Sequence, residues 1–388
     1  MTRIVNFIEK TVSLASGMRN ADINFDTMTA SAVVMVSDVM RNGRPLIGVA
    51  FDSIGRYGHG ALLRERFVPR LLNASPSEYA GPYGPGICPH KLWSLVMKNE
   101  KAGGHGERAG AVGLIDAAAW DLQAKIEDKP LWALLHEKFP GASTPNKTAV
   151  YASGGHYRPG QEVDGPKQEI TRYRRRGFSR FKIKAGGLPL EQDMTRIEMA
   201  INAAGGAENL SVDFNAGLTE ANSHDWLNAV QDYKLAWVEE PVDPLDYQLL
   251  ADLCHAYPGA ISAGENLFSF ADTRNLLRHG GMRPSQDLLN MDISLSYGLV
   301  EYGRILGLLA DYGWARRACI PHAGHLLSAH AAAGLGLGGH ETAPDHPIFG
   351  QYPDDCSVVD GHLLLGDRPG TGLEHTAGLK DIFNSIHS

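Results

Sequence analysis

The stretch FKIK at residues 181–184 opens a series of short apolar segments that each end in a charged side chain. The series continues with LSVD (210–213), AWVE (236–239), ISAGE (261–265), LNMD (289–292) and ACIPH (318–322), and YAS (151–153) precedes it. The charged ends recur every 26–30 residues, which is the length of one strand, one helix and two loops. Counted with Ser153, seven polar strand ends and a candidate eighth near Glu341 predict an α/β fold whose parallel strands close into a TIM-type β/α barrel. A doubly wound open sheet is the alternative, but eight units favour closure.

The first third of the chain has a different pattern of predicted strands and helices. Strand-like stretches at residues 3–8, 31–39 and 46–51 include the turn signal Asn42-Gly43-Arg44-Pro45 between the last two. Helical periodicity follows over residues 109–126, and a short apolar helix over 131–135 comes after Pro130. These features predict an α+β domain before the barrel, with a small antiparallel sheet and helices packed on it.

The composition narrows the class of protein. The 388 residues carry a formal net charge of −8, with 43% hydrophobic and 21% charged residues, as in soluble globular enzymes. The acidic excess argues against nucleic acid and anionic membranes as partners, because no basic surplus is available to meet phosphates. The four cysteines form no C-x-x-C pair, the N-terminus is a poor signal peptide, and no run of 18 apolar residues occurs. We therefore expect a cytoplasmic protein without disulfides.

Three carboxylates end three consecutive predicted strands: Asp213, Glu239 and Glu265. The carboxyl ends of barrel strands meet at one mouth, where these groups would repel one another unless a cation lay between them. An all-oxygen ligand set with spare coordination positions suits Mg²⁺. The sequence therefore predicts a magnesium site at the barrel mouth.

Two candidate proton-transfer groups flank this site. Lys182 and Lys184 are two apart on one strand, so both side chains point to the barrel interior. Adjacent ammonium groups near a divalent cation lower each other's pKa, so at least one lysine is expected to be a neutral base near pH 7. His322 and Asp292 follow neighbouring strands, where the aspartate can orient the imidazole. A base, an acid and a metal together indicate removal of a proton α to a carboxylate.

At these residues the sequence resembles the enolase superfamily, mandelate racemase subgroup. The similarity rests on Lys182-x-Lys184, Asp213 and Asn215 in VDFN, Glu239-Glu240-Pro241, Gly264-Glu265-Asn266, Asp292, His322, Ile115-Asp116 and Trp120-Asp121-Leu122. The resemblance implies a capping domain over residues 1–140, a catalytic barrel over 141–350 and a segment, 351–388, that packs back on the capping domain. It also implies homo-oligomers.

The same resemblance assigns roles to residues. Asp213, Glu239 and Glu265 would be the Mg²⁺ ligands, Lys184 the base, and His322 with Asp292 the second acid/base. Lys182, Asn215 and Glu341 would contact the substrate, with Glu341 and Lys182 at its carboxylate. Within the subgroup, chain length and the segment SIGRYGHGALLRERFVPRLL (53–72) are most similar to D-tartrate dehydratases. This implies a hydro-lyase in which Lys184 removes the C2 proton of D-tartrate, and His322 assists loss of the C3 hydroxyl to give oxaloacetate.

Several alternatives and specificity residues stay open. Another acid-sugar dehydratase, a racemase or a noncatalytic binding barrel could share this scaffold. A family loop at residues 14–25 is expected to help select the substrate, with Arg19, Arg56 and Lys101 as candidates to bind a distal carboxylate. Gly334-x-Gly336-x-x-Gly339 lacks the strand–turn–helix context of a dinucleotide site, and Pro344 excludes a zinc H-E-x-x-H helix. His59 and His105, in glycine-rich stretches, are expected to be solvated.

Overall fold

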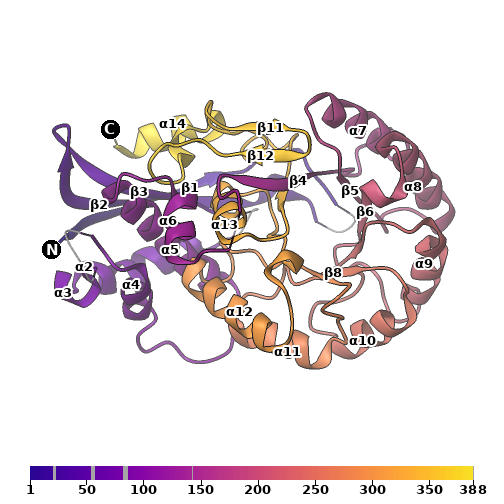
Figure 1. Ribbon diagram of the computed structural model, residues 1–388, viewed down its shortest axis with the longest axis horizontal. Coiled ribbons are helices and arrows are strands. Elements are labelled where there is room, and N and C mark those ends of the chain that lie inside the picture. The colour runs from indigo at the N-terminus through magenta and orange to yellow at the C-terminus, as the bar shows by residue number, and fades with distance from the viewer. Residues whose placement is uncertain (21–22, 54–56, 82–85, 142, 388) are drawn as a thin grey trace.

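The computed structural model describes residues 1–20, 23–53, 57–81, 86–141 and 143–387. A small N-terminal unit lies beside a larger ring of strands and helices, as Figure 1 shows. The N-terminal sheet has the antiparallel order β1 (Ile4–Ser13), β2 (Thr29–Arg41), β3 (Arg44–Phe51). Asn42 and Gly43 join β2 to β3 with φ of 52° and 76°, the pair of positive values that a two-residue hairpin turn requires. The predicted α+β domain is confirmed.

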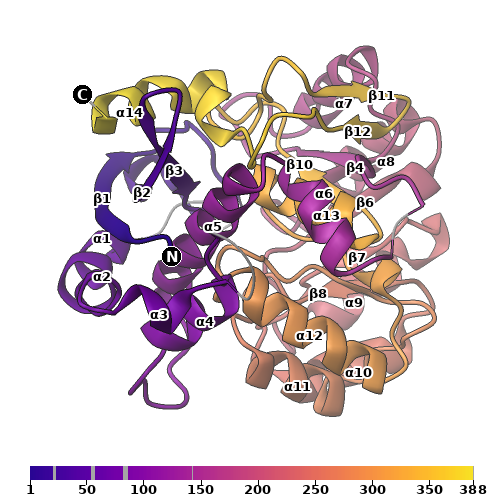
Figure 2. The ribbon, with the colours of Figure 1, turned by 60° about the vertical axis from the view of Figure 1, so that its left-hand side comes forward.

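Six α-helices of the described residues accompany this sheet. Their bounds are α1 (His59–Leu62), α2 (Val68–Leu72), α3 (Pro76–Tyr79), α4 (Pro89–Val96), α5 (Glu107–Ile126) and α6 (Leu131–Lys138). Helix α5 lies between the small sheet and the barrel (Figure 2), so apolar side chains on every side of it are buried. The backbone of α5 packs directly on the backbone of the barrel, because a Cβ on Gly113 would lie 1.9 Å from the carbonyl oxygen of Ser294. The two units thus share one continuous apolar core.

The second unit is a closed barrel of short parallel strands. Its strands are β4 (Lys147–Gly154), β5 (Phe181–Lys184), β6 (Leu210–Asp213), β7 (Val238–Glu239), β8 (Ile261–Ala263), β9 (Leu288–Leu289) and β10 (His340–Thr342). Neighbours pair in chain order from β4 to β9, and β10 pairs in parallel with β4. The predicted fold class, a capping α+β domain followed by a β/α barrel, is confirmed.

The seventh predicted strand, over residues 318–322, is reduced to a single bridge. Cys319 pairs with Leu289, and the amides of Gly338 and Glu341 donate to the carbonyls of Cys319 and Pro321 at 2.9 and 3.4 Å. Pro321 has no N–H to donate, which prevents a longer ladder here. The barrel still closes because this segment contacts both of its neighbours.

Helices cover the outside of the barrel. They are α7 (Gly165–Arg175), α8 (Leu190–Ala204), α9 (Ser223–Val230), α10 (Tyr247–Ala256), α11 (Phe270–His279), α12 (Leu299–Asp311) and α13 (Leu326–Leu335). None of the helices in the described part of the chain is both long and apolar enough to cross a membrane.

The C-terminal segment contacts both units. The hairpin of β11 (Ser357–Val359) and β12 (His362–Leu364) pairs antiparallel with the first residues of β4. Helix α14 (Ala377–His387) then lies against β1 and β2, where the ammonium of Lys10 donates to the hydroxyl of Ser385 at 2.7 Å. Of the segment 351–388, which was expected to pack back on the capping domain, α14 thus lies against the N-terminal sheet and the hairpin against the barrel sheet.

Candidate active site

The predicted metal ligands meet at the carboxyl ends of the barrel strands. Asp213 ends β6, Glu239 ends β7, and Glu265 lies two residues beyond β8. In the ladder Asp213 is the partner of both Lys184 and Glu239, so adjacent strands place these side chains next to one another. All three carboxylates are buried, and each offers an oxygen within 4.8 Å of the other two. The structure therefore brings together the three carboxylates that the sequence analysis selected.

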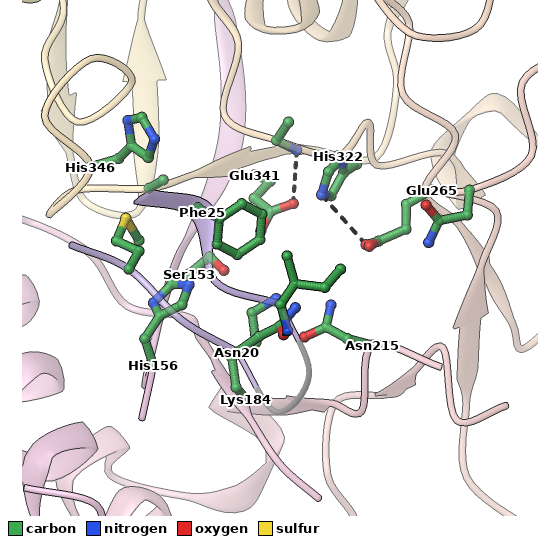
Figure 3. Close-up of a pocket in the computed structure, with 15 residues that line it drawn as sticks. Asn20, Phe25, Ser153, His156, Lys184, Asn215, Glu265, His322, Glu341 and His346 are labelled. Carbon is green, nitrogen blue, oxygen red and sulfur yellow. Dashed lines mark hydrogen bonds and ion pairs between the residues drawn. The ribbon is translucent and has the colours of Figure 1, made fainter. Parts of the chain in front are cut away.

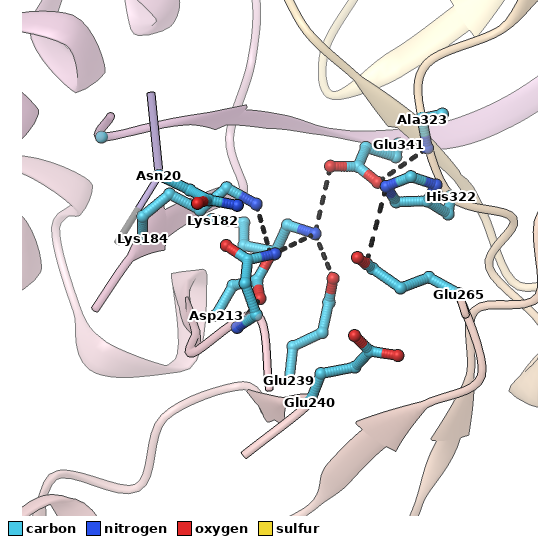
Figure 4. A network of polar contacts seen from close by, with 12 residues as sticks. Asn20, Lys182, Lys184, Asp213, Glu239, Glu240, Glu265, His322, Ala323 and Glu341 are labelled. Atoms are coloured by element: carbon cyan, nitrogen blue, oxygen red, sulfur yellow. Dashed lines mark hydrogen bonds and ion pairs between the residues drawn. The ribbon is translucent and has the colours of Figure 1, made fainter. Parts of the chain in front are cut away.

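The lysine pair lies inside the same cluster (Figure 4). The Lys182 ammonium is 3.2 Å from an Asp213 oxygen and 3.1 Å from Glu341 Oε1, and it also contacts Glu239. Lys184 Nζ donates to Asp213 Oδ2 at 2.6 Å. The β5 strand thus points both ammonium groups at the barrel axis, as the two-residue spacing predicts.

Lys182 lowers the pKa of Lys184, as expected for two adjacent ammonium groups, but the carboxylates around the pair act in the opposite direction. Burial, the largest single effect, and the repulsion from Lys182 favour the neutral amine, but the charges of Asp213, Glu265 and Glu341 together raise the pKa of Lys184 above its ordinary value. The same contact with the lysines holds the pKa of Asp213 at about 2, although burial opposes it. These carboxylates therefore attract the ammonium groups in addition to being candidate metal ligands, and this attraction sets the direction of both pKa shifts.

On the other side of the cluster, His322 pairs with Asp292. His322 Nδ1 lies 3.2 Å from Asp292 Oδ2, and its Nε2 lies 3.5 Å from Glu265 Oε2. Burial disfavours the imidazolium, but the charges of Glu265, Asp292 and Glu341 raise the pKa of His322 to about 9. Asp292 also accepts the amide of Leu295 at 2.9 Å, which fixes its carboxylate. The Nε2 of His322 is thus directed toward the carboxylate cluster with a proton available.

A cavity of about 100 Å³ connects these groups (Figure 3). One wall of the cavity comes from the barrel mouth and includes Lys184, Asn215, Glu265 and His322. Residues between β1 and β2 form the opposite wall: Met18, Asn20, Ile23 and Phe25. The segment expected to select the substrate therefore closes over the candidate catalytic groups.

The candidate substrate-binding residues divide into two groups. Asn215 and Glu341 line the cavity, and Glu341 Oε2 accepts the amide of Ala323 at 3.0 Å. Glu341 lies on β10, a strand of three residues that forms although the sequence around it has little strand character. Arg19 is exposed and lines a neighbouring surface pocket instead of this cavity.

The other two candidate cations do not add to the cavity wall. Lys101 is exposed and stands outside the lining, and Arg56 falls outside the described residues. None of the three candidates for a distal carboxylate is thus placed in the cavity by the described part of the chain.

Some lining residues were missed by the sequence analysis. Ser153 is the next-to-last residue of β4, His156 follows this strand, and His346 follows β10. Burial and the nearby Lys184 lower the pKa of His156 to about 3, and burial lowers the pKa of His346 to about 4, so both rings are neutral. Applying the rule that strand ends carry function to β4 and β10 would have identified them.

The expectation of solvated histidines is wrong for His59. Its ring is buried, with Nδ1 2.7 Å from Asp52 and Nε2 2.8 Å from Glu107. His105 is half-buried and contacts the Tyr297 hydroxyl at 3.0 Å. Glycine-rich sequence around both positions indicated exposure, but Gly110 leaves room for the His59 ring to pack against α5, since a Cβ on Gly110 would lie 2.4 Å from that ring.

The donor set fits Mg²⁺. Four carboxylates, those of Asp213, Glu239, Glu265 and Glu341, face two ammonium groups, so negative charge is in excess. Glu265 Oε2 and Asn215 Oδ1 are buried oxygens without a hydrogen bond in the described structure. Hard oxygen donors with unsatisfied lone pairs are the ligands that Mg²⁺ prefers, and Asp213, Glu239 and Glu265 would hold it. Magnesium is the cofactor that this site is built to take.

The fold and the site together define a metal-dependent β/α-barrel enzyme with a capping domain. Residues 167–378 match the family described as enolase C-terminal domain-like, which is more than half of the chain. The protein therefore belongs to the enolase superfamily, in the mandelate racemase/muconate lactonizing subgroup.

Three relatives illustrate this membership. The chain is 27% identical over 285 residues to a 3,6-anhydro-alpha-L-galactonate cycloisomerase of Streptomyces coelicolor, covering 73% of this chain and 74% of that protein. It is 25% identical over 355 residues to an L-talarate/galactarate dehydratase of Salmonella typhimurium, covering 89% and 81%. The crystal structure of a racemase from Streptomyces coelicolor A3(2) with bound magnesium superimposes with a TM-score of 0.78 at 21% identity, covering 100% and 99%.

Proposed function

We propose that this protein is a Mg²⁺-dependent hydro-lyase that converts D-tartrate to oxaloacetate and water. The observation that supports dehydration is the placement of Lys184 and the His322–Asp292 pair on opposite sides of one carboxylate triad. A base and an acid that face each other across a bound substrate can remove a proton and protonate a leaving hydroxyl without moving.

Each residue has a role in this reaction. Lys184 Nζ accepts the proton from C2, and Lys182 keeps its charge to hold an oxygen of the substrate carboxylate. His322 Nε2 donates its proton to the departing C3 hydroxyl, while Asp292 orients the ring through Nδ1. Bound Mg²⁺ would supply an electrophile for the carboxylate next to the acidic proton. The enol that results tautomerises to the keto acid.

The choice of a short substrate is supported by the cavity. The apolar side chains of Met18, Ile23 and Phe25 close a space of about 100 Å³ over the catalytic groups. A four-carbon acid needs less room than the six-carbon acids named for the talarate/galactarate relative. Asn20, Ser153 and Asn215 offer amide and hydroxyl groups to the distal hydroxyl and carboxylate oxygens.

The test is a substrate screen with the full-length protein in MgCl2. Keto-acid formation is measured for D-, L- and meso-tartrate and for galactarate, L-talarate and arabinonate, with an EDTA-treated sample as the control. We expect turnover of D-tartrate, dependent on Mg²⁺. Absence of keto acid from D-tartrate contradicts the substrate, and absence from every acid tested contradicts the reaction.

One further outcome would favour a different reaction on the same scaffold. Incorporation of solvent deuterium at C2 with no loss of water would indicate a racemase, in which Lys184 and His322 exchange protons on opposite faces. Proton NMR of each acid incubated in D2O distinguishes the two reactions.

A further inference from the structure

The residues after strand β3 of the capping domain contact the Asp292–His322 pair at the barrel mouth. Ser53, two residues beyond β3, donates its hydroxyl hydrogen to Asp292 Oδ2, the same oxygen that faces His322 Nδ1. Both Ser53 and Asp292 are fully buried. Ser53, a residue of the N-terminal unit, is therefore part of the hydrogen-bond chain that ends at His322.

The position of Ser53 is set by contacts on both sides of the domain boundary. The adjacent Asp52 accepts the amide of Ser31 in β2 at 2.7 Å and contacts the His59 ring at 2.7 Å. On the barrel side, the Phe51 carbonyl lies 2.6 Å from His325 Nε2. Residues 51–53 are thus held at once by the small sheet, by α1 and by the start of α13, which leaves the hydroxyl little freedom to turn.

The contacts to Asp292 show what the hydroxyl does. Asp292 Oδ1 accepts the Leu295 amide at 2.9 Å, while Oδ2 is shared by Ser53 and His322. A carboxylate held at both oxygens cannot rotate away from the imidazole, and it keeps the proton on Nδ1 so that Nε2 faces the cavity. Removing the Ser53 hydroxyl releases the oxygen that pairs with His322.

We propose that Ser53 is a positioning residue, through which the capping domain holds the Asp292–His322 pair in its reactive orientation. This inference rests on the proposed function, because it assigns His322 to the loss of the hydroxyl. Ser53 lies outside the lining of the cavity in the described structure and acts on the substrate only through Asp292 and His322. Lys184, on the opposite side of the triad, keeps its own contacts.

The test compares Ser53→Ala with a matched control, Ser37→Ala. Ser37 is equally buried in the capping domain, but its hydroxyl donates to the Leu46 carbonyl at 2.8 Å, far from the barrel mouth. With Mg²⁺ and D-tartrate, we expect Ser53→Ala to lower kcat for dehydration about 10- to 100-fold with KM unchanged. Deuterium exchange at C2 in D2O, which depends on Lys184, is retained. Ser37→Ala keeps both activities.

A second measurement needs no substrate. In ¹⁵N-histidine-labelled, Mg²⁺-loaded protein, the Nδ1–H resonance of His322, assigned by its loss in His322→Asn, is expected to shift or broaden in Ser53→Ala and not in Ser37→Ala. An unchanged resonance, unchanged kcat, or equal loss of exchange and dehydration overturns the assignment of Ser53. If the wild-type protein fails to dehydrate D-tartrate, the proposed function fails, and the resonance still decides whether Ser53 positions His322.

Discussion

The pKa values of single side chains in this protein depend on which charged groups the barrel places next to them. Lys184 and Asp213 illustrate the point, since each shifts the pKa of the other in the direction that keeps both charged. A divalent cation at the triad competes for the same carboxylate oxygen, and positive charge nearby favours the neutral amine. Metal binding and the basicity of Lys184 are therefore coupled through Asp213.

The role of Lys184 leads to a prediction at this scale. Lys184→Ala removes the proposed base but none of the three metal ligands, so we expect turnover to be lost while Mg²⁺ affinity stays within a few-fold of wild type. Keto-acid assays and calorimetric titration with MgCl2 measure the two quantities. Lys167→Ala, an exposed lysine on α7, is the control and keeps full activity. Dehydration that persists in Lys184→Ala contradicts the assignment of the base.

His59 leads to a prediction about stability and pH. Burial disfavours its charged form, but Asp52 and Glu107 raise its pKa to about 9, above the ordinary 6.5. A group whose pKa is higher in the folded than in the unfolded protein stabilises the folded state. This stabilisation is complete below the pKa of the unfolded state and is lost as the pH rises through the pKa of the folded state. Between pH 6.5 and 9.5 the wild type should therefore lose about 3 kcal/mol more unfolding free energy than His59→Gln, because only the wild type loses the contribution of the charged His59.

Urea unfolding at a series of pH values measures this difference. A His59→Gln profile parallel to that of the wild type would show that the ion pairs with Asp52 and Glu107 contribute nothing to folding. The measurement does not depend on the substrate or the metal, because His59 lies outside the cavity lining.

At the scale of elements, helix α5 joins the two units and supports the segment that carries Asp292. Its Gly113 packs directly on the Ser294 backbone, and Asp116 Oδ2 accepts the Leu299 amide at 2.6 Å, where α12 begins. The segment from Asp292 to Leu299 is thus held by α5 along its length. Sequence periodicity predicted a helix over residues 109–126, whereas the burial of α5 on all sides follows from its place between two units.

A methyl group at Gly113 should disturb this contact. In Gly113→Ala the new Cβ would meet the Ser294 carbonyl at 1.9 Å, so the backbone must move, and overpacking of this kind costs about 1–3 kcal/mol. We expect a lower melting temperature together with reduced dehydration, because the displaced segment carries Asp292. Gly303→Ala on α12 is the matched control.

The control position differs from Gly113 only in its surroundings. A Cβ on Gly303 would meet no atom within 4 Å, so alanine there should be neutral or stabilising by up to about 1 kcal/mol through its higher helix propensity. Thermal unfolding of both variants gives the comparison, and equal melting temperatures would contradict the close contact of α5 with residue 294.

At the scale of the whole molecule, the metal site exists only when the barrel is closed. Its ligands come from three strands and are 26 residues apart in the chain, so an unfolded chain cannot present them together. A ligand that binds only the folded state raises stability by about 2.7 kcal/mol at 100 times its Kd. We therefore expect MgCl2 to raise the melting temperature of the wild-type protein, and the rise to continue with the logarithm of the MgCl2 concentration above the Kd.

The matched variants for this prediction are Glu265→Gln and Glu191→Gln. Glu265 belongs to the triad and Glu191 is exposed on α8, so only the first substitution should reduce the magnesium-dependent rise. Differential scanning calorimetry with and without EDTA measures the effect. An equal rise in Glu265→Gln would place the metal elsewhere.

Much of the fold and the site could be predicted from the sequence. The 26–30-residue spacing of polar strand ends predicted the barrel, and because parallel strands end at one mouth, it also predicted that Asp213, Glu239, Glu265, Lys182 and Lys184 would meet. Both predictions follow from patterns between residues that are close in sequence. Side chains two apart on a strand point to the same face, and one unit of strand and helix repeats along the chain.

Other features were decided only by the tertiary structure. The pKa of Lys184, the burial of His59 and the wall formed by Met18, Ile23 and Phe25 depend on groups that are far apart in sequence. Ser53 reaches Asp292 across 239 positions of the chain, which no pattern of spacing could reveal. The sequence by itself determined which groups gather at the barrel mouth, because strand order does that locally. Only the packing of the capping domain on the barrel decided how those groups are oriented, covered and charged, because these properties come from contacts between distant segments.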